Sequence, residues 1–320
     1  ADRDSIEQGG HLTPADPDCV SPKAFQRGID QIGTLGSGNH YLELEVVREE
    51  NIYDTKVAQR FGLDRPNQIL INIHCGSRGF GHQIATDYLQ VFTEAVKRYG
   101  IEINDRELAC APFNSPEGQR YFKAMNCAAN NAFANRQVIV HHVRRAFREV
   151  FGKSDAELGL STIYDVAHNI AKRERYTIEG REQEVIVHRK GATRSFGPGM
   201  AGLPARYRDV GQPVLVGGSM ETGAYLLVGT ELSATETYGS TLHGAGRTMS
   251  RMQAKKAIRG DKLRQQMEDS GIMLRAASLR GLAEEAGFAY KNIDDVIEAV
   301  ERIGISRKVA KLLPVGNIKG

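Results

Sequence analysis

The sequence of 320 residues contains no apolar stretch that approaches the roughly 20 residues of a membrane-spanning helix, so no membrane protein is expected. We also expect no apolar leader of the secretory type. Cysteine is scarce, and the wide spacing of Cys19, Cys75, Cys110 and Cys127 matches no CxxC zinc pattern. We therefore expect four free thiols in an intracellular protein, with Cys75 as a lesser metal-ligand candidate because it adjoins His74.

Composition places the chain among folded proteins. Hydrophobic residues make up 41% of the sequence, which is enough for a sizeable core, and charged residues make up 25%, which is too few for a disordered chain. The net charge of +3 neither requires nor excludes a nucleic-acid partner, because a local basic patch can exist within a balanced total. The chain begins with Ala1 instead of methionine, so we expect that residues precede it in the whole protein.

Hydrophobic periodicity indicates a mixed fold. Alternating apolar and acidic residues predict a strand over 41–47, and the run QILINIH predicts a strand over 68–74. Helices are expected over 81–98 and 117–151. Further strands are expected over 162–166, 184–188, 214–216 and 225–229, and further helices over 250–258, 279–286 and 294–303. Strands and helices do not alternate regularly, which argues against a Rossmann fold. We predict a single α+β domain over 1–320, with mixed, largely antiparallel sheets forming a central β-core surrounded by helices.

Three histidines occupy similar positions in this pattern. His40 ends the run GSGNH, His74 ends a predicted strand, and His168 ends the strand-like run TIYDVAH. Strand ends beside glycine turns tend to converge on a shared cleft, and imidazole is a common metal ligand. The alternative is that each is a core histidine with satisfied hydrogen bonds. The HExxH spacing of zinc proteases is absent, and His141 and His142 are interpreted as structural or surface residues.

Glycine-rich turns form the second group of candidates. The runs at 36–39, 217–220 and 244–246 match neither the P-loop nor GxGxxG, so each alone is compatible with an ordinary turn. The run HGAGR is more specific. We expect it to lead into a helix near Arg247, whose N-terminus would favour an anion and place His243 to attack a phosphorus atom.

Basic residues form the third group. The run HRKGATR at 188–194 mixes cations with small residues, and Arg78, Arg247, Arg251 and Lys319 add to it. A solvated surface run and a phosphate-lined groove are both compatible with this pattern, and the interleaved Gly and Thr favour the groove.

Taken together, the motifs resemble one known family. The resemblance rests on the runs GTLGSGNHYLELEVV, HCGSRGFGH, ANRQVI, DVAHNIAK, VHRKGATRSFGPG, GSMETGAYLL, STLHGAGRTMSR and VGNIKG. In this order they resemble the RtcB-type RNA-splicing ligases over the whole chain. The family's N-terminal D-x-G-C-G motif, whose Asp and Cys complete the metal site, is not found, so the chain resembles the C-terminal two-thirds of the family's proteins.

The resemblance implies a GTP-dependent RNA ligase with two Mn²⁺ ions. Such an enzyme joins RNA ends carrying a 2′,3′-cyclic phosphate or 3′-phosphate to 5′-hydroxyl ends, and His243 would carry the GMP intermediate. The metal ligands implied are His40, His74 and His168. The guanylate contacts implied are Asn39, His40, Tyr41, Leu42, Glu43, His168, Asn169, Gly217, Gly218, Ser219, Met220, Ala224, His243, Gly244, Ala245, Gly246, Tyr290 and Lys319. The RNA or anion contacts implied are Arg78, Lys190, Arg247 and Arg251.

The resemblance also implies partners and leaves alternatives. It implies a cytoplasmic enzyme acting on tRNA halves or broken RNA, completed by an N-terminal segment of the same protein and helped by an archease-type activator. Gly217 stands where the family usually has proline, and Ala224 where it has serine. The alternatives are a metal-dependent phosphoesterase or cyclic phosphodiesterase that uses the same histidines, and a catalytically incomplete RNA-binding fragment.

Overall fold

The computed structural model describes residues 2–320, which form two compact units. The first, here called the sheet unit, contains the residues up to Glu7 together with Leu35–His74 and Ser161–Gly320. The second, here called the helical unit, contains Gln8–Thr34 and Cys75–Leu160. The chain thus crosses between the units four times, and a single catalytic domain over 1–320 stays a prediction.

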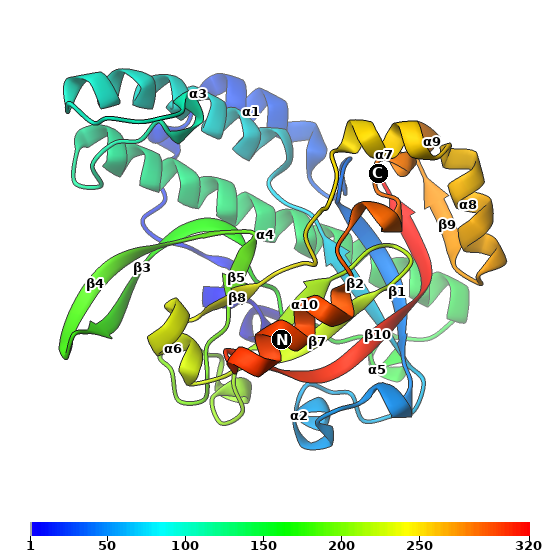
Figure 1. Cartoon of the computed structure of the whole chain (residues 1–320). Helices are drawn as coiled ribbons and strands as arrows, with labels where there is room; N and C mark the ends of the chain where they lie inside the picture. The colour runs from blue at the N-terminus through cyan, green and yellow to red at the C-terminus, as the bar shows by residue number, and fades with distance from the viewer. Residues whose placement is uncertain (1) are drawn as a thin grey trace. The chain divides into compact units, whose positions relative to one another are not determined.

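The sheet unit is built on a six-stranded sheet, shown in Figure 1. Its strands, in spatial order, are β2 (Gln68–His74), β1 (Tyr41–Val47), β10 (Ser306–Lys319), β7 (Ala224–Gly229) and β6 (Pro213–Gly217), with β9 (Met273–Ala276) beside β10. Only β9 pairs in parallel, and every other pairing in this sheet is antiparallel. The predicted α+β class with largely antiparallel strands is confirmed.

Two smaller strand pairs complete the unit. A long hairpin joins β3 (Asn169–Ile178) to β4 (Arg181–Lys190), and β5 (Ala192–Arg194) pairs with β8 (Ser240–Leu242). Figure 1 shows the β3–β4 hairpin as a long, curved green ribbon. Both small pairs matter for the site, because His168 immediately precedes β3 and His243 immediately follows β8.

Three apolar clusters form the core of the sheet unit. Alternation along the strands places Val47, Leu226, Val228 and Leu312 in the largest cluster. A second cluster packs the amphipathic α10 on β6 and β7 through Ile293 and Ile297, and a third lies under α8 and α9. The helices of this unit are α2 (Thr55–Arg60), α6 (Leu232–Thr237), α7 (Arg251–Ala257), α8 (Gly260–Asp269), α9 (Leu279–Ala283) and α10 (Ile293–Ile303).

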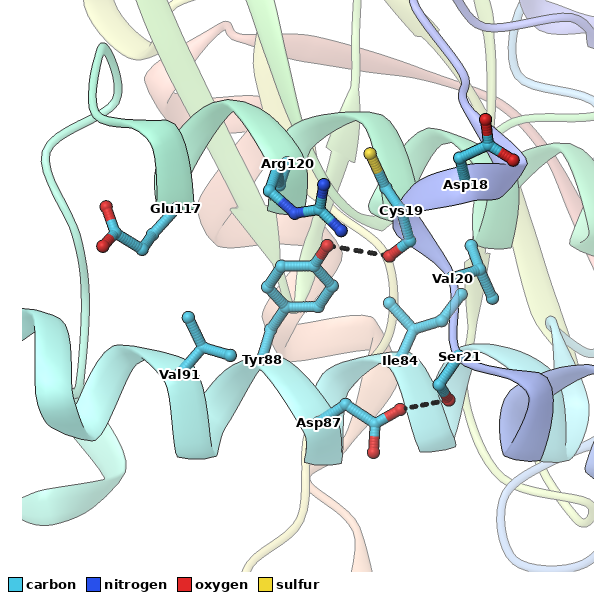
Figure 2. A pocket seen from close by; sticks show the side chains of 10 residues that line it. All are labelled: Asp18, Cys19, Val20, Ser21, Ile84, Asp87, Tyr88, Val91, Glu117 and Arg120. Carbon is cyan, nitrogen blue, oxygen red and sulfur yellow. Dashed lines mark hydrogen bonds between the residues drawn. The ribbon is translucent and has the colours of Figure 1, made fainter.

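The helical unit consists of α1 (Pro22–Gly28), α3 (Arg78–Arg98), α4 (Pro116–Phe151) and the short α5 (Asp155–Leu158). The long α4 starts where the Ser115 side chain caps the amide of Gly118, and it ends at Gly152, whose φ of 64° is left-handed. The unit also holds a cavity of about 260 Å³, whose lining includes Cys19, Tyr88 and Arg120 (Figure 2). No predicted site residue lines it.

Short 3-10 helices connect these elements. They are η1 (Asp2–Ser5), η2 (Glu7–Gly10), η3 (Pro17–Cys19), η4 (Ile29–Gln31), η5 (Glu49–Asn51), η6 (Arg106–Leu108), η7 (Ala205–Tyr207) and η8 (Gly287–Ala289). In the part of the chain from 2 to 320, no helix has the length and apolar character needed to cross a bilayer.

Two predicted elements are wrong. The segment 162–166 is not a strand of any sheet, because its backbone bonds to the first residues of the chain: the Asp165 amide donates to the Ser5 carbonyl at 2.9 Å. The helix expected near Arg247 begins instead at Arg251, because Ser250 and Gln253 form a capping box there. The other predicted elements lie within or close to observed ones. Elements that lack a matching prediction include the strands β3, β5, β8, β9 and β10 and the helices α2, α5, α6 and α8.

Candidate active site

Four histidines converge at one edge of the sheet unit. His74 lies at the end of β2, and its Nε2 is 3.1 Å from Nε2 of His168. The His168 ring stacks on the His243 ring, with 4.4 Å between centroids and 25° between planes. The His40 ring lies edge-on to His74 at 5.6 Å. The structure therefore brings together the three predicted metal ligands and the predicted nucleophile, which come from four separate segments.

His74 is held as a neutral imidazole. Its Nδ1 lies 3.1 Å from the backbone carbonyl of Asn39, which fits an N–H at Nδ1 and leaves Nε2 as the electron-pair donor. Burial, together with charge repulsion from the neighbouring His40 and His243, lowers the pKa of His74 to about 3. A neutral ring with a fixed tautomer is the form that ligates a metal ion.

The three imidazoles supply donors but no complete coordination shell. Among residues 2–320, no three His, Cys, Asp or Glu side chains are arranged to hold one ion between them. The short distance between Nε2 of His74 and Nε2 of His168 nevertheless aims two ring nitrogens at one point. Neutral imidazoles suit divalent transition-metal ions, so the donor chemistry present fits such an ion.

His243 is placed by the turn that follows β8. Its carbonyl accepts from the Gly217 amide at 3.3 Å, and the Ala245 amide donates to the Gly217 carbonyl at 2.9 Å. Burial lowers the pKa of His243, and the positive charge of Lys190 lowers it further. Below its pKa a histidine is protonated and has no free electron pair, so this lowering favours the nucleophilic form at neutral pH.

At the glycine turns the backbone lies so close to neighbouring atoms that a larger side chain would not fit. A side chain at Gly217 would place its Cβ 2.9 Å from the Tyr41 hydroxyl, and one at Gly244 would lie 3.3 Å from the Gly217 carbonyl. Gly246 has a φ of 77°, which explains why the chain turns there instead of continuing into a helix. The helix N-terminus expected beside His243 is therefore absent.

One face of β1 carries a buried polar row. Tyr41, Glu43 and Glu45 share this face, since side chains alternate along a strand. The side-chain amide of Asn72 donates to the Tyr41 hydroxyl at 3.1 Å, and the side-chain amide of Asn317 donates to the Glu43 carboxylate at 3.0 Å. Burial raises the pKa of Glu43 to about 7, although Asn317 and Lys319 oppose this rise.

Replacing Glu45 with Gln should stabilise the protein at neutral and alkaline pH. Burial and the charge of Glu43 raise the pKa of Glu45 well above 4.5, so the folded state holds a proton that the unfolded state releases. Stability from this group is present at low pH and is lost as the pH rises above 4.5. We expect Glu45→Gln to gain about 1–3 kcal/mol at pH 8 and little at pH 4, in urea unfolding followed across pH. Equal gains at both pH values would show that Glu45 is not the titrating group.

A second charged cluster lies beside the polar row. Arg247 donates to Glu285 at 3.2 Å and stacks its guanidinium on the Tyr290 ring at 4.9 Å. Arg251 also donates to Glu285, at 3.1 Å, and the Tyr290 hydroxyl donates to the same carboxylate. Lys319 is buried and donates to the Gly38 carbonyl at 3.3 Å. The Arg247 guanidinium is thus occupied by protein acceptors, whereas the Arg251 side chain remains 52% exposed.

Some predicted site residues point elsewhere. Leu42 lies on the face of β1 opposite to Tyr41 and Glu43. Ala224 and Met220 pack in apolar clusters, so they shape the turn from within the core. Arg78 belongs to the helical unit, where its guanidinium donates to Thr34 at 3.1 Å.

The remaining candidates are placed as follows. Asn169 and Lys190 are exposed and pair at the base of the β3–β4 hairpin, next to His168. In the helical unit Cys75 is buried and accepts from the Asn135 amide at 3.5 Å, and all four cysteines are free thiols, as predicted. His141 and His142 are exposed on α4, which confirms them as surface residues.

Several residues of this region were missed from the sequence. Glu45, Asn72 and Asn317 belong to the buried polar row, and Glu285 anchors the charged cluster. An acidic residue at alternate positions of the strand 41–47 was visible, but the same alternation is typical of a solvent-facing strand side. Only the folded structure shows that this side is buried, since Glu43 is 3% and Glu45 0% exposed.

Comparison with known proteins identifies similar chains. The family model described as tRNA-splicing ligase RtcB matches residues 1–320. A protein of that name from Archaeoglobus fulgidus is 54% identical over 314 residues, which cover 98% of this chain and 64% of the relative. One from Pyrococcus abyssi is 53% identical over 319 residues, which cover 100% of this chain and 34% of the relative. The chain therefore spans only part of the length of these relatives.

Proposed function

The chain belongs to the RtcB family, and on that premise we propose that it is the part of an RNA ligase that carries the guanylylated histidine. The enzyme would join RNA ends with a 2′,3′-cyclic phosphate or 3′-phosphate to ends with a 5′-hydroxyl, with GTP as the nucleotide. The observation that carries the proposal is the convergence of His243 with three further imidazoles. The two relatives compared above bear the name tRNA-splicing ligase.

The proposed reaction begins at His243. A ring nitrogen of this neutral histidine attacks the α-phosphorus of GTP, a nitrogen–phosphorus bond forms, and pyrophosphate leaves with the electrons of the broken anhydride bond. A 3′-phosphate oxygen of the RNA then takes the GMP from the histidine. The 5′-hydroxyl oxygen finally attacks that 3′-phosphorus, GMP leaves, and a phosphodiester remains. A cyclic phosphate is first opened by hydrolysis to the 3′-phosphate.

The chain's own residues support this sequence of steps in distinct ways. His40, His74 and His168 would hold Mn²⁺, which when bound supplies phosphate-charge neutralisation and alignment of the attacking atom. Because no three donors here form one shell, we propose that the N-terminal segment of the whole protein completes the site. Glu43 and Lys319 offer an acceptor and a donor to the polar edge of guanine, and the glycine turns at 217–220 and 244–246 allow the nucleotide to approach the backbone closely.

The proposal extends to partners and location. Lys190 and Arg251 are exposed cations that suit RNA phosphate, and Arg78 is proposed as an anion contact of the helical unit. Together with an archease-type activator, the enzyme would act in the cytoplasm on tRNA halves or broken RNA. Both units are proposed to serve one catalytic domain.

Strand joining by the full-length protein tests this function. With GTP and Mn²⁺, an RNA with a 3′-phosphate and a partner with a 5′-hydroxyl should yield one longer product on a denaturing gel. The matched control pair carries a 3′-hydroxyl and a 5′-phosphate and should remain unjoined. Loss of the terminal phosphate without joining would instead support a phosphoesterase, and RNA binding without either reaction would support a binding fragment.

A further inference from the structure

The segment that carries His168 has no regular secondary structure, yet it is firmly held. Residues 163–167 run without a strand or helix before β3 begins at Asn169. The first residues of the chain lie beside them: the Asp165 amide donates to the Ser5 carbonyl, and the Glu7 amide donates to the Asp165 carbonyl, both at 2.9 Å. The placement of His168 therefore depends on contacts made by the segment Ser5–Glu7.

The Glu7 side chain makes the central contacts of this arrangement. It is fully buried, and its Oε1 lies 2.7 Å from Nζ of Lys172 and 3.1 Å from Nε of Arg194. Its other oxygen, Oε2, accepts from the Ala167 amide at 3.1 Å. Burial alone would raise the pKa of Glu7, but the two cations outweigh burial and lower it to about 2, so the group stays ionised.

The two cations are themselves fixed. Arg194 donates to Gln212 and to the Tyr164 hydroxyl, both at 2.7 Å, and it is buried. Lys172 is also buried, on β3 four residues after His168. Glu7 thus joins the strand that follows His168 to the segment that precedes it. The Glu7 carboxylate thereby links both cations to the peptide of Ala167.

This frame bears directly on the histidine cluster. Ala167 is the residue before His168, whose Nε2 lies 3.1 Å from His74 and whose ring stacks on His243. A ring held at such distances tolerates little displacement of its backbone, since shifts near 1 Å reduce both ligation and catalysis strongly. Glu7 bonds directly to the Ala167 amide, so its effect on the His168 ring passes through the backbone.

We propose that Glu7 is a positioning residue that sets the placement of the His168 imidazole through the backbone of Ala167. This role rests on the proposed function, in which His168 is a metal ligand. Glu7 touches no reacting group in this arrangement, and it lies 161 positions before His168 in the sequence. Its contribution is to hold the metal-binding geometry at a point where the sheet itself provides no strand.

Two variants of the full-length protein distinguish the effect of the side-chain length of Glu7 from the effect of its charge. Glu7→Asp keeps the negative charge between the two cations but withdraws the carboxylate from the Ala167 amide. Glu7→Gln keeps the side-chain length but removes the counter-charge nearest to two buried cations, and it can therefore fail to fold. We expect Glu7→Asp to raise the dissociation constant for Mn²⁺, measured by electron paramagnetic resonance of the free ion, about tenfold. Hydrogen exchange of the peptide covering 163–168 should accelerate in parallel.

A cavity variant supplies the matched control. Leu263→Ala removes a buried side chain of α8 from an apolar cluster that does not include the segment 163–168. It should lower the thermal midpoint while leaving Mn²⁺ affinity and exchange of 163–168 within twofold of the wild type. The proposal is overturned if Glu7→Asp leaves the exchange of 163–168 unchanged, or if Leu263→Ala shifts both readouts equally. Should the wild type bind no Mn²⁺, the metal assignment of the proposed function fails, and hydrogen exchange still decides the role of Glu7.

Discussion

Replacing His243 with Ala should abolish formation of the covalent GMP adduct. Full-length protein incubated with α-labelled GTP and Mn²⁺ should retain acid-labile label, and His243→Ala should lower that label at least about a thousandfold, as expected for loss of a nucleophile. The physical reason is that His243 is kept neutral by burial and by Lys190, and is oriented by its stacking on His168. Protein-bound label after acrylamide gel electrophoresis measures the adduct directly.

A second histidine variant makes this result specific. His141 is exposed on α4, so His141→Ala removes the same side chain without altering the cluster and should retain full labelling. Because His243 lies at a turn and not in a core cluster, its replacement should leave the thermal midpoint within a few degrees of the wild type. Persistence of acid-labile label in His243→Ala would assign the nucleophile to another residue, even if strand joining were lost.

The histidine cluster was accessible from sequence because each member stands at a strand end or turn. His40, His74 and His243 flank glycines or close an alternating run, and such positions meet at sheet edges. His168 was assigned correctly to the cluster but for a wrong reason, since the strand expected before it does not exist. Its actual support, Glu7, is distant in the sequence and lies in a polar run that no local pattern distinguishes.

The fold was predictable from sequence where the hydrophobic residues of a segment follow a single clear pattern. β1 and β2 show clear alternation or a continuous apolar run, and α3 and α4 are long, so local propensity and tertiary packing agree. β10 was missed because its register shifts opposite Leu44 and Glu45 and again between Lys308 and Ala310. Such irregularities break the period of two that identifies a strand. This strand nevertheless pairs with three others, so the largest omission concerned the centre of the sheet.

Replacing Gly223 with Ala should destabilise the sheet unit far more than the backbone conformation alone explains. Gly223 has a φ of 71°, and a Cβ there would lie 2.1 Å from the Leu312 carbonyl oxygen and 2.9 Å from Pro314. The left-handed conformation costs about 1–2 kcal/mol for alanine. Separating β7 from β10 to relieve the clash should bring the total to about 4 kcal/mol. Urea unfolding should show this as a lower midpoint at an unchanged slope.

Gly180 provides the control that isolates the clash. It has a φ of 75° in the turn of the β3–β4 hairpin, and a Cβ there meets nothing within 4 Å, so Gly180→Ala should lose only the conformational share of about 1–2 kcal/mol. The difference has a functional side, because the Gly223 carbonyl accepts from the Gly218 amide at 2.9 Å and so holds the turn at 217–220. At a temperature where Gly223→Ala is still folded, it should therefore bind GTP more weakly than Gly180→Ala. Equal unfolding midpoints for the two variants would mean that β10 can move away at Leu312 without loss of stability. The close approach of Gly223 to the Leu312 carbonyl would then not determine the conformation of this turn.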